Sequence, residues 1–96
     1  MQYDIVVLGS GPAGLSAAVA ARSRNKSLLV IGSRWQDSPL ARAEQVDNYL
    51  GMPALTGAEL MERFYRHAEE MGTNMVTGRV VALMAWNGFQ LTAGGE

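Results

Sequence analysis

The segment from residue 5 to residue 14 constrains the fold more than any other, because an uninterrupted apolar run ends there among three glycines. The strand predicted before them, 3–8, is built mainly of branched or bulky residues, as expected of a parallel strand covered on both faces. An alanine-rich segment, 12–25, follows and predicts a helix. The spacing Gly-x-Gly-x-x-Gly between a strand and a helix predicts a turn that binds the pyrophosphate of a dinucleotide.

Each glycine of this turn has a physical role in the prediction. Gly9 permits the tight turn, Gly11 lets the backbone approach a phosphate without an intervening Cβ, and Gly14 permits close packing of helix on strand. Pro12 suits the first position of a helix, where its missing N–H costs nothing. The free N–H groups and the positive end of the helix dipole then face the anion. A glycine-rich turn that serves packing alone is the alternative.

A second strand is predicted at 27–31, which completes a right-handed β-α-β unit of about 30 residues. A dinucleotide fold usually has a carboxylate near the end of this strand to hold a ribose hydroxyl. Here that position is Ile31, and Gly32 follows it. Ser33 is a candidate to bind the ribose, and Arg34 is a candidate to face a phosphate such as that of NADP. A solvated loop position is the alternative for both.

Residues 35–53 form a long connection with no clear period, and connections of this length tend to be functional. The rings of Trp35 and Tyr49, together with the amide of Asn48, are candidates to line a ring-binding cleft. Burial of the aromatic rings in a small core is the alternative.

An amphipathic helix is predicted next, because Thr56-Gly57-Ala58-Glu59 has the pattern of a capping box. Leu60 and Phe64 lie on its apolar stripe, and Gly72 is a plausible end. His67, the one histidine of the chain, is expected to be packed or solvated, not catalytic.

The last quarter of the sequence predicts a β-hairpin. Its elements are a short strand at 74–76, a turn or bulge at Gly78, a first arm at 79–86, the turn Asn87-Gly88 and a return arm at 89–92. Residues 93–96 predict a further turn, and a turn at the end of a chain suggests truncation.

Composition narrows the classes of function. At 96 residues the chain is at most one domain, and its 48% hydrophobic content is typical of a globular fold. No apolar run approaches the ~20 residues of a membrane span, and no signal peptide is evident, so we expect a cytoplasmic protein. A net charge of −1 without a basic cluster argues against nucleic acid. With no cysteine, the chain holds no disulfide, thiolate metal site or redox dithiol, and we expect neither a metal site nor a catalytic residue in it.

Four blocks of sequence, at 3–14, 46–51, 55–61 and 64–72, carry a match to a known family that extends over nearly the whole chain. The first block is common among flavoproteins, whereas the second and third are more specific at this spacing. With these blocks the chain resembles the low-molecular-weight thioredoxin reductases and related FAD-dependent pyridine-nucleotide disulfide oxidoreductases.

The resemblance implies that residues 1–96 are the N-terminal portion of an FAD-binding domain. This portion would be a truncated α/β fold with a Rossmann-like β-α-β unit and a hairpin, and without an NAD(P)H domain. The implied cofactor is FAD, with residues 10–13 on its pyrophosphate, the segment after the second strand near the adenosine, Asn48 near the isoalloxazine ring and Val80 behind the adenine. The candidate cofactor-binding residues are Gly9, Ser10, Gly11, Pro12, Ala13, Gly14, Gly32, Ser33, Arg34, Asn48 and Val80.

The same resemblance implies that the whole protein is a homo-oligomer that passes electrons from NAD(P)H or ferredoxin to a thioredoxin or another disulfide substrate. Residues 41–51 are similar to a clostridial-type branch that takes electrons from ferredoxin or flavin. The chain departs from the family at Ile31, at 36–38, where Gln-Asp-Ser replaces Gly-Gly-Gln, and in lacking the Cys-x-x-Cys motif.

Three alternatives remain open at the level of sequence. The first is a nucleotide-binding or interaction module without catalysis, and the second is an NADP-binding Rossmann unit. The third is a chain that does not fold alone and self-associates through open sheet edges.

Overall fold

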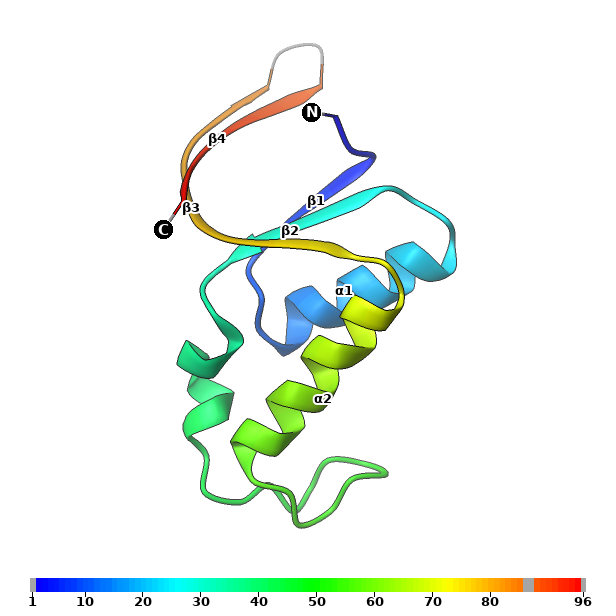
Figure 1. Ribbon diagram of the computed structural model, residues 1–96, viewed down its shortest axis with the longest axis vertical. Coiled ribbons are helices and arrows are strands. Elements are labelled where there is room, and N and C mark those ends of the chain that lie inside the picture. The colour runs from blue at the N-terminus through cyan, green and yellow to red at the C-terminus, as the bar shows by residue number, and fades with distance from the viewer. Residues whose placement is uncertain (1, 86–87, 96) are drawn as a thin grey trace.

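Three parallel strands form the centre of the structure, and both α-helices lie on the same side of them (Figure 1). The computed structural model describes residues 2–85 and 88–95. The strands are β1 (Ile5–Leu8), β2 (Leu28–Gly32) and the first part of β3 (Asn74–Ala85), in that order across the sheet. The predicted α/β fold with a parallel β-α-β unit is therefore confirmed.

The first strand is two residues shorter at its start than expected. Asp4 and Ser27 form a reciprocal pair there: the Ser27 N–H donates to Asp4 Oδ2 at 2.9 Å, and the Asp4 N–H donates to Ser27 Oγ at 2.8 Å. These hydrogen bonds lower the pKa of Asp4, the backbone bond most strongly. These two hydrogen bonds thus join the residues that directly precede β1 and β2, one position before the first paired residues, Ile5 and Leu28.

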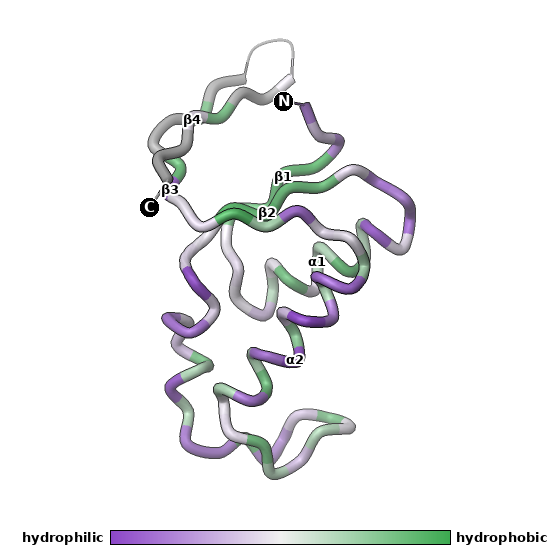
Figure 2. The backbone as a smooth tube through the Cα atoms, viewed as in Figure 1, coloured by the Kyte–Doolittle hydropathy of each residue, from purple (hydrophilic) through white to green (hydrophobic). Residues whose placement is uncertain are grey.

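Helix α1 (Pro12–Ser23) covers the sheet and forms much of the core. Leu15 and Ala18 are buried and pack with Val30 of β2, and Figure 2 shows the strongly apolar colouring of β1 and β2 above the helix. The helix ends at Ser23, two residues earlier than expected, because Asn25 has a φ of +57°, which is not helical, and residues 24–27 lead the chain into β2.

Helix α2 (Gly57–Glu70) packs across α1. The predicted capping box is present, with the Glu59 N–H donating to Thr56 Oγ1 at 3.1 Å and the Thr56 N–H donating to Glu59 Oε1 at 3.0 Å. These bonds lower the pKa of Glu59. Leu60 is buried as expected, and His67 is exposed.

Strand β3 changes partners along its length, which corrects the sequence prediction. Residues 74–77 pair with β2, and residues 78–85 pair with the antiparallel strand β4 (Phe89–Gly95). Gly78 therefore lies inside one continuous strand and is neither a turn nor a bulge, whereas the register shift falls between Val80 and Ala82. The expected hairpin is confirmed by the pairing of β3 with β4, although residue 86 of its predicted first arm and residue 87 of its predicted turn lie outside the described residues.

The turn predicted at the end of the sequence is wrong for residues 93–95. They belong to β4 and pair with residues 78–80 of β3. Ala-Gly-Gly has little intrinsic preference for a strand, but the neighbouring strand supplies backbone partners that decide the conformation.

The connection between β2 and α2 contains two short 3₁₀ helices, η1 (Trp35–Asp37) and η2 (Pro39–Arg42). Beyond them, Val46 and Leu55 form an isolated antiparallel bridge that closes a protruding loop. Within the described residues, no helix has the length and apolar character needed to span a membrane.

Candidate functional site

The glycine turn lies at the carboxyl end of β1 and is attached to the end of β2. The Gly9 N–H donates to the Ile31 carbonyl at 2.8 Å, and the Ser10 hydroxyl donates to the Ser33 carbonyl at 2.5 Å. Gly9 has a φ of +118°, which residues with a side chain rarely adopt. The structure thus brings together two segments, 9–14 and 32–34, that the sequence predicts to act jointly.

Two glycines allow close packing at the turn, Gly14 where α1 meets the turn and β1, and Gly32 where the end of β2 meets the turn. A Cβ on Gly14 would overlap the Gly9 carbonyl oxygen and would lie 3.3 Å from Val7 Cγ1, so the predicted packing of helix on strand is confirmed. A Cβ on Gly32 would lie 2.7 Å from both the backbone nitrogen and the Oγ of Ser10. Any side chain at Gly14 or Gly32 would therefore push the turn out of place.

The N-terminus of α1 is open, whereas that of α2 is closed by its capping box. Gly11 is the N-cap residue of α1, and among the described residues no side chain caps this helix and no acidic side chain lies in its first turn. A Cβ added to Gly11 would have no heavy atom of the described residues within 4 Å, apart from those of its two chain neighbours. The free N–H groups of the first turn and the positive end of the dipole are thus available to an anion beside Gly11.

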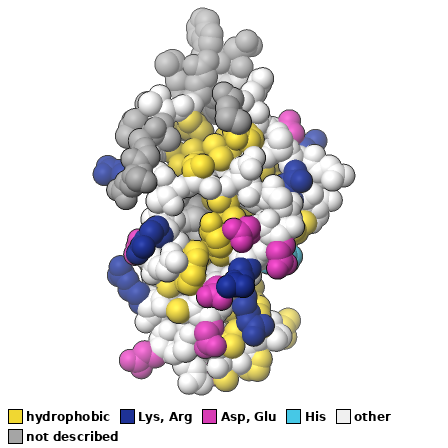
Figure 3. Space-filling view, viewed as in Figure 1, with side chains coloured by type: hydrophobic (Ala, Val, Ile, Leu, Met, Phe, Trp, Pro, Cys, Tyr) yellow, Lys and Arg dark blue, Asp and Glu magenta, His cyan; other side chains and the backbone are white. Residues whose placement is uncertain are grey.

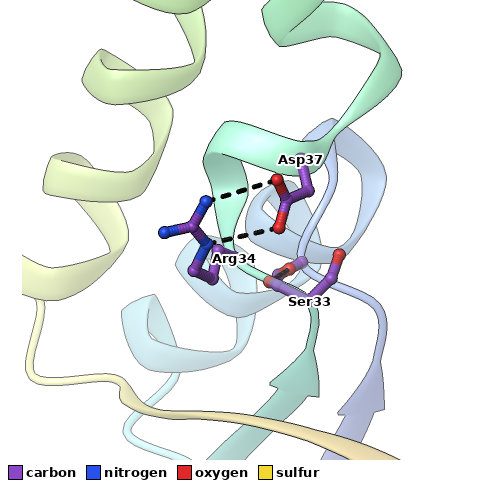
Figure 4. A network of polar contacts seen from close by, with 4 residues as sticks. Ser33, Arg34 and Asp37 are labelled. Atoms are coloured by element: carbon purple, nitrogen blue, oxygen red, sulfur yellow. Dashed lines mark hydrogen bonds and ion pairs between the residues drawn. The ribbon is translucent and has the colours of Figure 1, made fainter. Parts of the chain in front are cut away.

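Arg34 follows β2 and is paired with Asp37 (Figure 4). Its Nε lies 3.2 Å from Asp37 Oδ2, and its second nitrogen, Nη2, lies 3.4 Å from Oδ1. The pair raises the pKa of Arg34 and lowers the pKa of Asp37, in both cases through the hydrogen bond first and the charge second. A phosphate that approached the guanidinium would therefore compete with Asp37.

The other predicted residues lie on separate elements. Trp35 is partly buried and packs against the core, which favours the alternative given for it, packing of the ring in a small core. Tyr49 is 45% exposed, and its ring lies 5.2 Å from that of Phe64 on α2. Asn48 is exposed, and Val80 lies on the part of β3 that pairs with β4. The FAD contacts assigned to Asn48 and Val80 stay predictions that rest on the resemblance.

Sequence reasoning missed a groove of about 650 Å³ between α1, α2 and the turn at residues 49–52. Its wall on α1 begins at Pro12, and most of its lining surface is apolar. Two crossing helices create the groove, so no local pattern marks it. One face of α2 contributes Arg63, Arg66, His67 and Glu70 to the lining, but this spacing does not reveal the second wall on α1.

A parallel β-α-β unit with a glycine turn that opens an uncapped helix defines a Rossmann-like nucleotide-binding domain. The chain belongs to the family of NAD(P)-binding Rossmann-like domains, whose profile matches residues 7–73.

Proteins similar to this chain include thioredoxin reductases, as the sequence blocks predicted. The chain is 30% identical to the thioredoxin reductase of Bacillus subtilis over 94 residues, which are 98% of this chain and 30% of that protein. It is 44% identical to the glucosaminate ammonia-lyase of Pseudomonas fluorescens over 81 residues, which cover 82% of this chain and 25% of that enzyme. The chain thus spans less than a third of the length of these curated relatives.

Among solved structures, the fold is similar to that of a ferredoxin-flavin thioredoxin reductase from Clostridium acetobutylicum. The TM-score is 0.85 and the identity is 38%, over 98% of this chain and 33% of that one. The resemblance to the thioredoxin reductases is therefore confirmed at the level of sequence and of fold.

Proposed function

We propose that this chain is the FAD-binding segment of a flavoprotein oxidoreductase similar to thioredoxin reductase. The observation that carries this proposal is the open N-terminus of α1, which begins at a glycine turn held against the end of β2. Bound FAD would supply the electron transfer, while the chain would bind and orient the cofactor.

The residues of the turn fit a dinucleotide pyrophosphate. The backbone N–H groups of Ser10, Gly11, Ala13 and Gly14 have no described acceptor, so they are free to donate to phosphate oxygens. The Ser10 side chain is engaged with the Ser33 carbonyl, and it therefore braces the turn while its N–H stays available. No acidic side chain in the first turn opposes the anion.

The relatives support a cofactor-binding role over a substrate-binding one. A thioredoxin reductase and a glucosaminate ammonia-lyase have different names and share this segment. A part common to enzymes of different activity is best explained by a common cofactor and fold. Residues 1–96 would then form the N-terminal portion of the FAD domain of a longer protein.

For the whole protein, we propose electron transfer to a thioredoxin or another disulfide substrate, in a cytoplasmic homo-oligomer. The similarity to a ferredoxin-flavin thioredoxin reductase supports ferredoxin as the donor, with NAD(P)H as the other candidate. These 96 residues contain no cysteine, so disulfide chemistry would need cysteines from additional sequence.

An NADP-binding unit is the second candidate. The family profile is described as NAD(P)-binding, and Arg34 stands at the end of β2, where an arginine accommodates a 2′-phosphate. The ion pair of Arg34 with Asp37 weighs against it, because the phosphate must displace a carboxylate.

The absorption spectrum of the purified chain, refolded with FAD and passed through a desalting column, tests the leading candidate. We expect a retained flavin band in the visible range. A colourless protein that is folded by circular dichroism, with all FAD in the small-molecule fractions, would contradict FAD binding by this segment.

A further inference from the structure

The segment 33–37 leaves the sheet directly after β2. Gly32 is the last residue of β2 and still pairs with Thr77 of β3, whereas the next residue lies beyond the strand. Arg34 and Asp37 bind one another within the segment, so their ion pair does not attach it to another element (Figure 4). The attachment of this segment to the glycine turn therefore depends on its first residue.

One side chain of the turn makes that attachment. The Ser10 hydroxyl donates to the Ser33 carbonyl at 2.5 Å. In the part of the chain that the structure describes, this is the only hydrogen bond between the turn, 9–14, and the segment 33–37. The fit is close, because a Cβ on Gly32 would lie 2.7 Å from Ser10 Oγ. The position of the segment relative to the turn is thus set by a single hydroxyl.

The two joined segments are candidates for different parts of one ligand. In a Rossmann-like unit the pyrophosphate lies on the glycine turn, and a polar residue near the end of the second strand binds the ribose of the adenosine. Ser33 is exposed, and its hydroxyl forms no hydrogen bond with the described residues, so it is free to meet a ribose. The bond from Ser10 therefore fixes the distance between the two candidate subsites.

Charge contributes little to placing the ligand. On the face drawn in Figure 3, basic and acidic side chains are intermixed, and no patch of one sign is seen there to concentrate an anion. Arg34 beside the turn is already engaged by Asp37. Affinity then depends on how well the backbone donors of the turn and the segment after β2 are positioned before the ligand arrives.

We propose, on the basis of the FAD-binding function proposed above, that Ser10 is a positioning residue, which holds the segment that begins at Ser33 so that one adenine nucleotide spans it and the glycine turn. The hydroxyl of Ser10 raises the affinity for the adenosine half without touching it, because the ligand does not have to order the segment on binding. The chemical class of ligand is an adenosine that carries a pyrophosphate.

Isothermal titration calorimetry of the full 96-residue chain with ADP and with inorganic pyrophosphate tests this role. The two ligands share the phosphates, and only ADP has the adenosine. We expect Ser10→Ala to weaken ADP binding about three- to tenfold and to leave pyrophosphate binding unchanged. Loss of a serine that only stabilised the fold would weaken the binding of both ligands to the same extent.

Ser23→Ala is the matched control, because the Ser23 hydroxyl also donates to a backbone carbonyl, that of Val19 at 2.8 Å, near the other end of α1. This control should bind both ligands like the original chain. An original chain that does not bind ADP, unchanged ADP affinity in Ser10→Ala, or an equal loss for ADP and pyrophosphate would each overturn the positioning role.

Titration of the same variants with FAD separates this result from the proposed function. Binding of ADP without binding of FAD would contradict the FAD-binding function, while weaker ADP binding by Ser10→Ala would still support the positioning role. FAD binding that Ser10→Ala leaves unchanged would overturn the positioning role and leave the FAD-binding function intact.

Discussion

Replacing Gly14 by alanine separates two opposite expectations for stability. In an ordinary helix, glycine is less stable than alanine by up to about 1 kcal/mol, so the substitution would stabilise the protein. Here the new Cβ would overlap the Gly9 carbonyl oxygen and press on Val7 Cγ1 at 3.3 Å. Backbone cannot move aside as a flexible side chain does, and overpacking of this kind costs about 1–3 kcal/mol.

We therefore expect Gly14→Ala to lower the free energy of unfolding by about 1–3 kcal/mol, with a fall in Tm of about 4–8 °C for each kcal/mol in a domain of this size. Thermal unfolding followed by circular dichroism measures the change. Ala17→Gly, at an exposed position of the same helix, calibrates helix propensity alone and should cost up to about 1 kcal/mol. A Gly14→Ala protein with a Tm equal to or above that of the original chain would refute the close approach of α1 and the turn.

The other predictions concern the cap, acid pH and the two nucleotide candidates. Thr56→Ala removes the N-cap acceptor of α2 and should cost about 1 kcal/mol of unfolding free energy, measured by urea denaturation. The folded-state pKa values of Asp4 and Glu59 lie below the ordinary values of 3.8 and 4.5. The two carboxylates therefore stabilise the folded protein fully at neutral pH, and this contribution is lost as the pH falls below the ordinary values and through the folded-state pKa values. Urea midpoints between pH 7 and pH 2 should show this fall, and Asp4→Asn should reduce it; an unchanged profile would contradict the assignment. Arg34→Ala should leave the Tm unchanged in scanning calorimetry, and a loss of NADPH affinity that exceeds any loss of FAD affinity in titration calorimetry would favour the NADP candidate.

The sequence predicted those parts of the fold that local chemistry determines. The turn from Gly9 to Gly14 is set by glycine and proline at fixed positions, and the start of α2 is set by the reciprocal bonds of Thr56 and Glu59. The predictions for Gly78 and for residues 93–95 were wrong because pairing with a neighbouring strand, and not local preference, decides the conformation there.

The positions of the candidate site segments were predictable to the same extent, whereas their contacts with a ligand stay predictions. The segments 9–14 and 32–34 were found because parallel strands of a β-α-β unit end at one edge of the sheet. The ion pair of Arg34 was missed, since its partner Asp37 was treated as part of a loop without structure. The groove depends on how α1 and α2 cross, which no spacing within either helix specifies.

The central claim is that the open N-terminus of α1 binds the pyrophosphate of FAD, and Gly11 provides its most direct test. As the N-cap residue of α1, Gly11 has a φ of −78°, which alanine adopts readily. A Cβ added there would have no heavy atom of the described residues within 4 Å, apart from those of its two chain neighbours. Gly11→Ala should therefore keep the fold while placing a methyl group where the phosphate must approach.

Isothermal titration calorimetry of the original chain and Gly11→Ala with FAD, NADPH and ATP makes this measurement. We predict that FAD binds more tightly than NADPH or ATP, and that Gly11→Ala lowers the FAD affinity at least about tenfold, or about 1.4 kcal/mol. NADPH binding without FAD binding, or FAD binding that Gly11→Ala leaves unchanged, would contradict the claim.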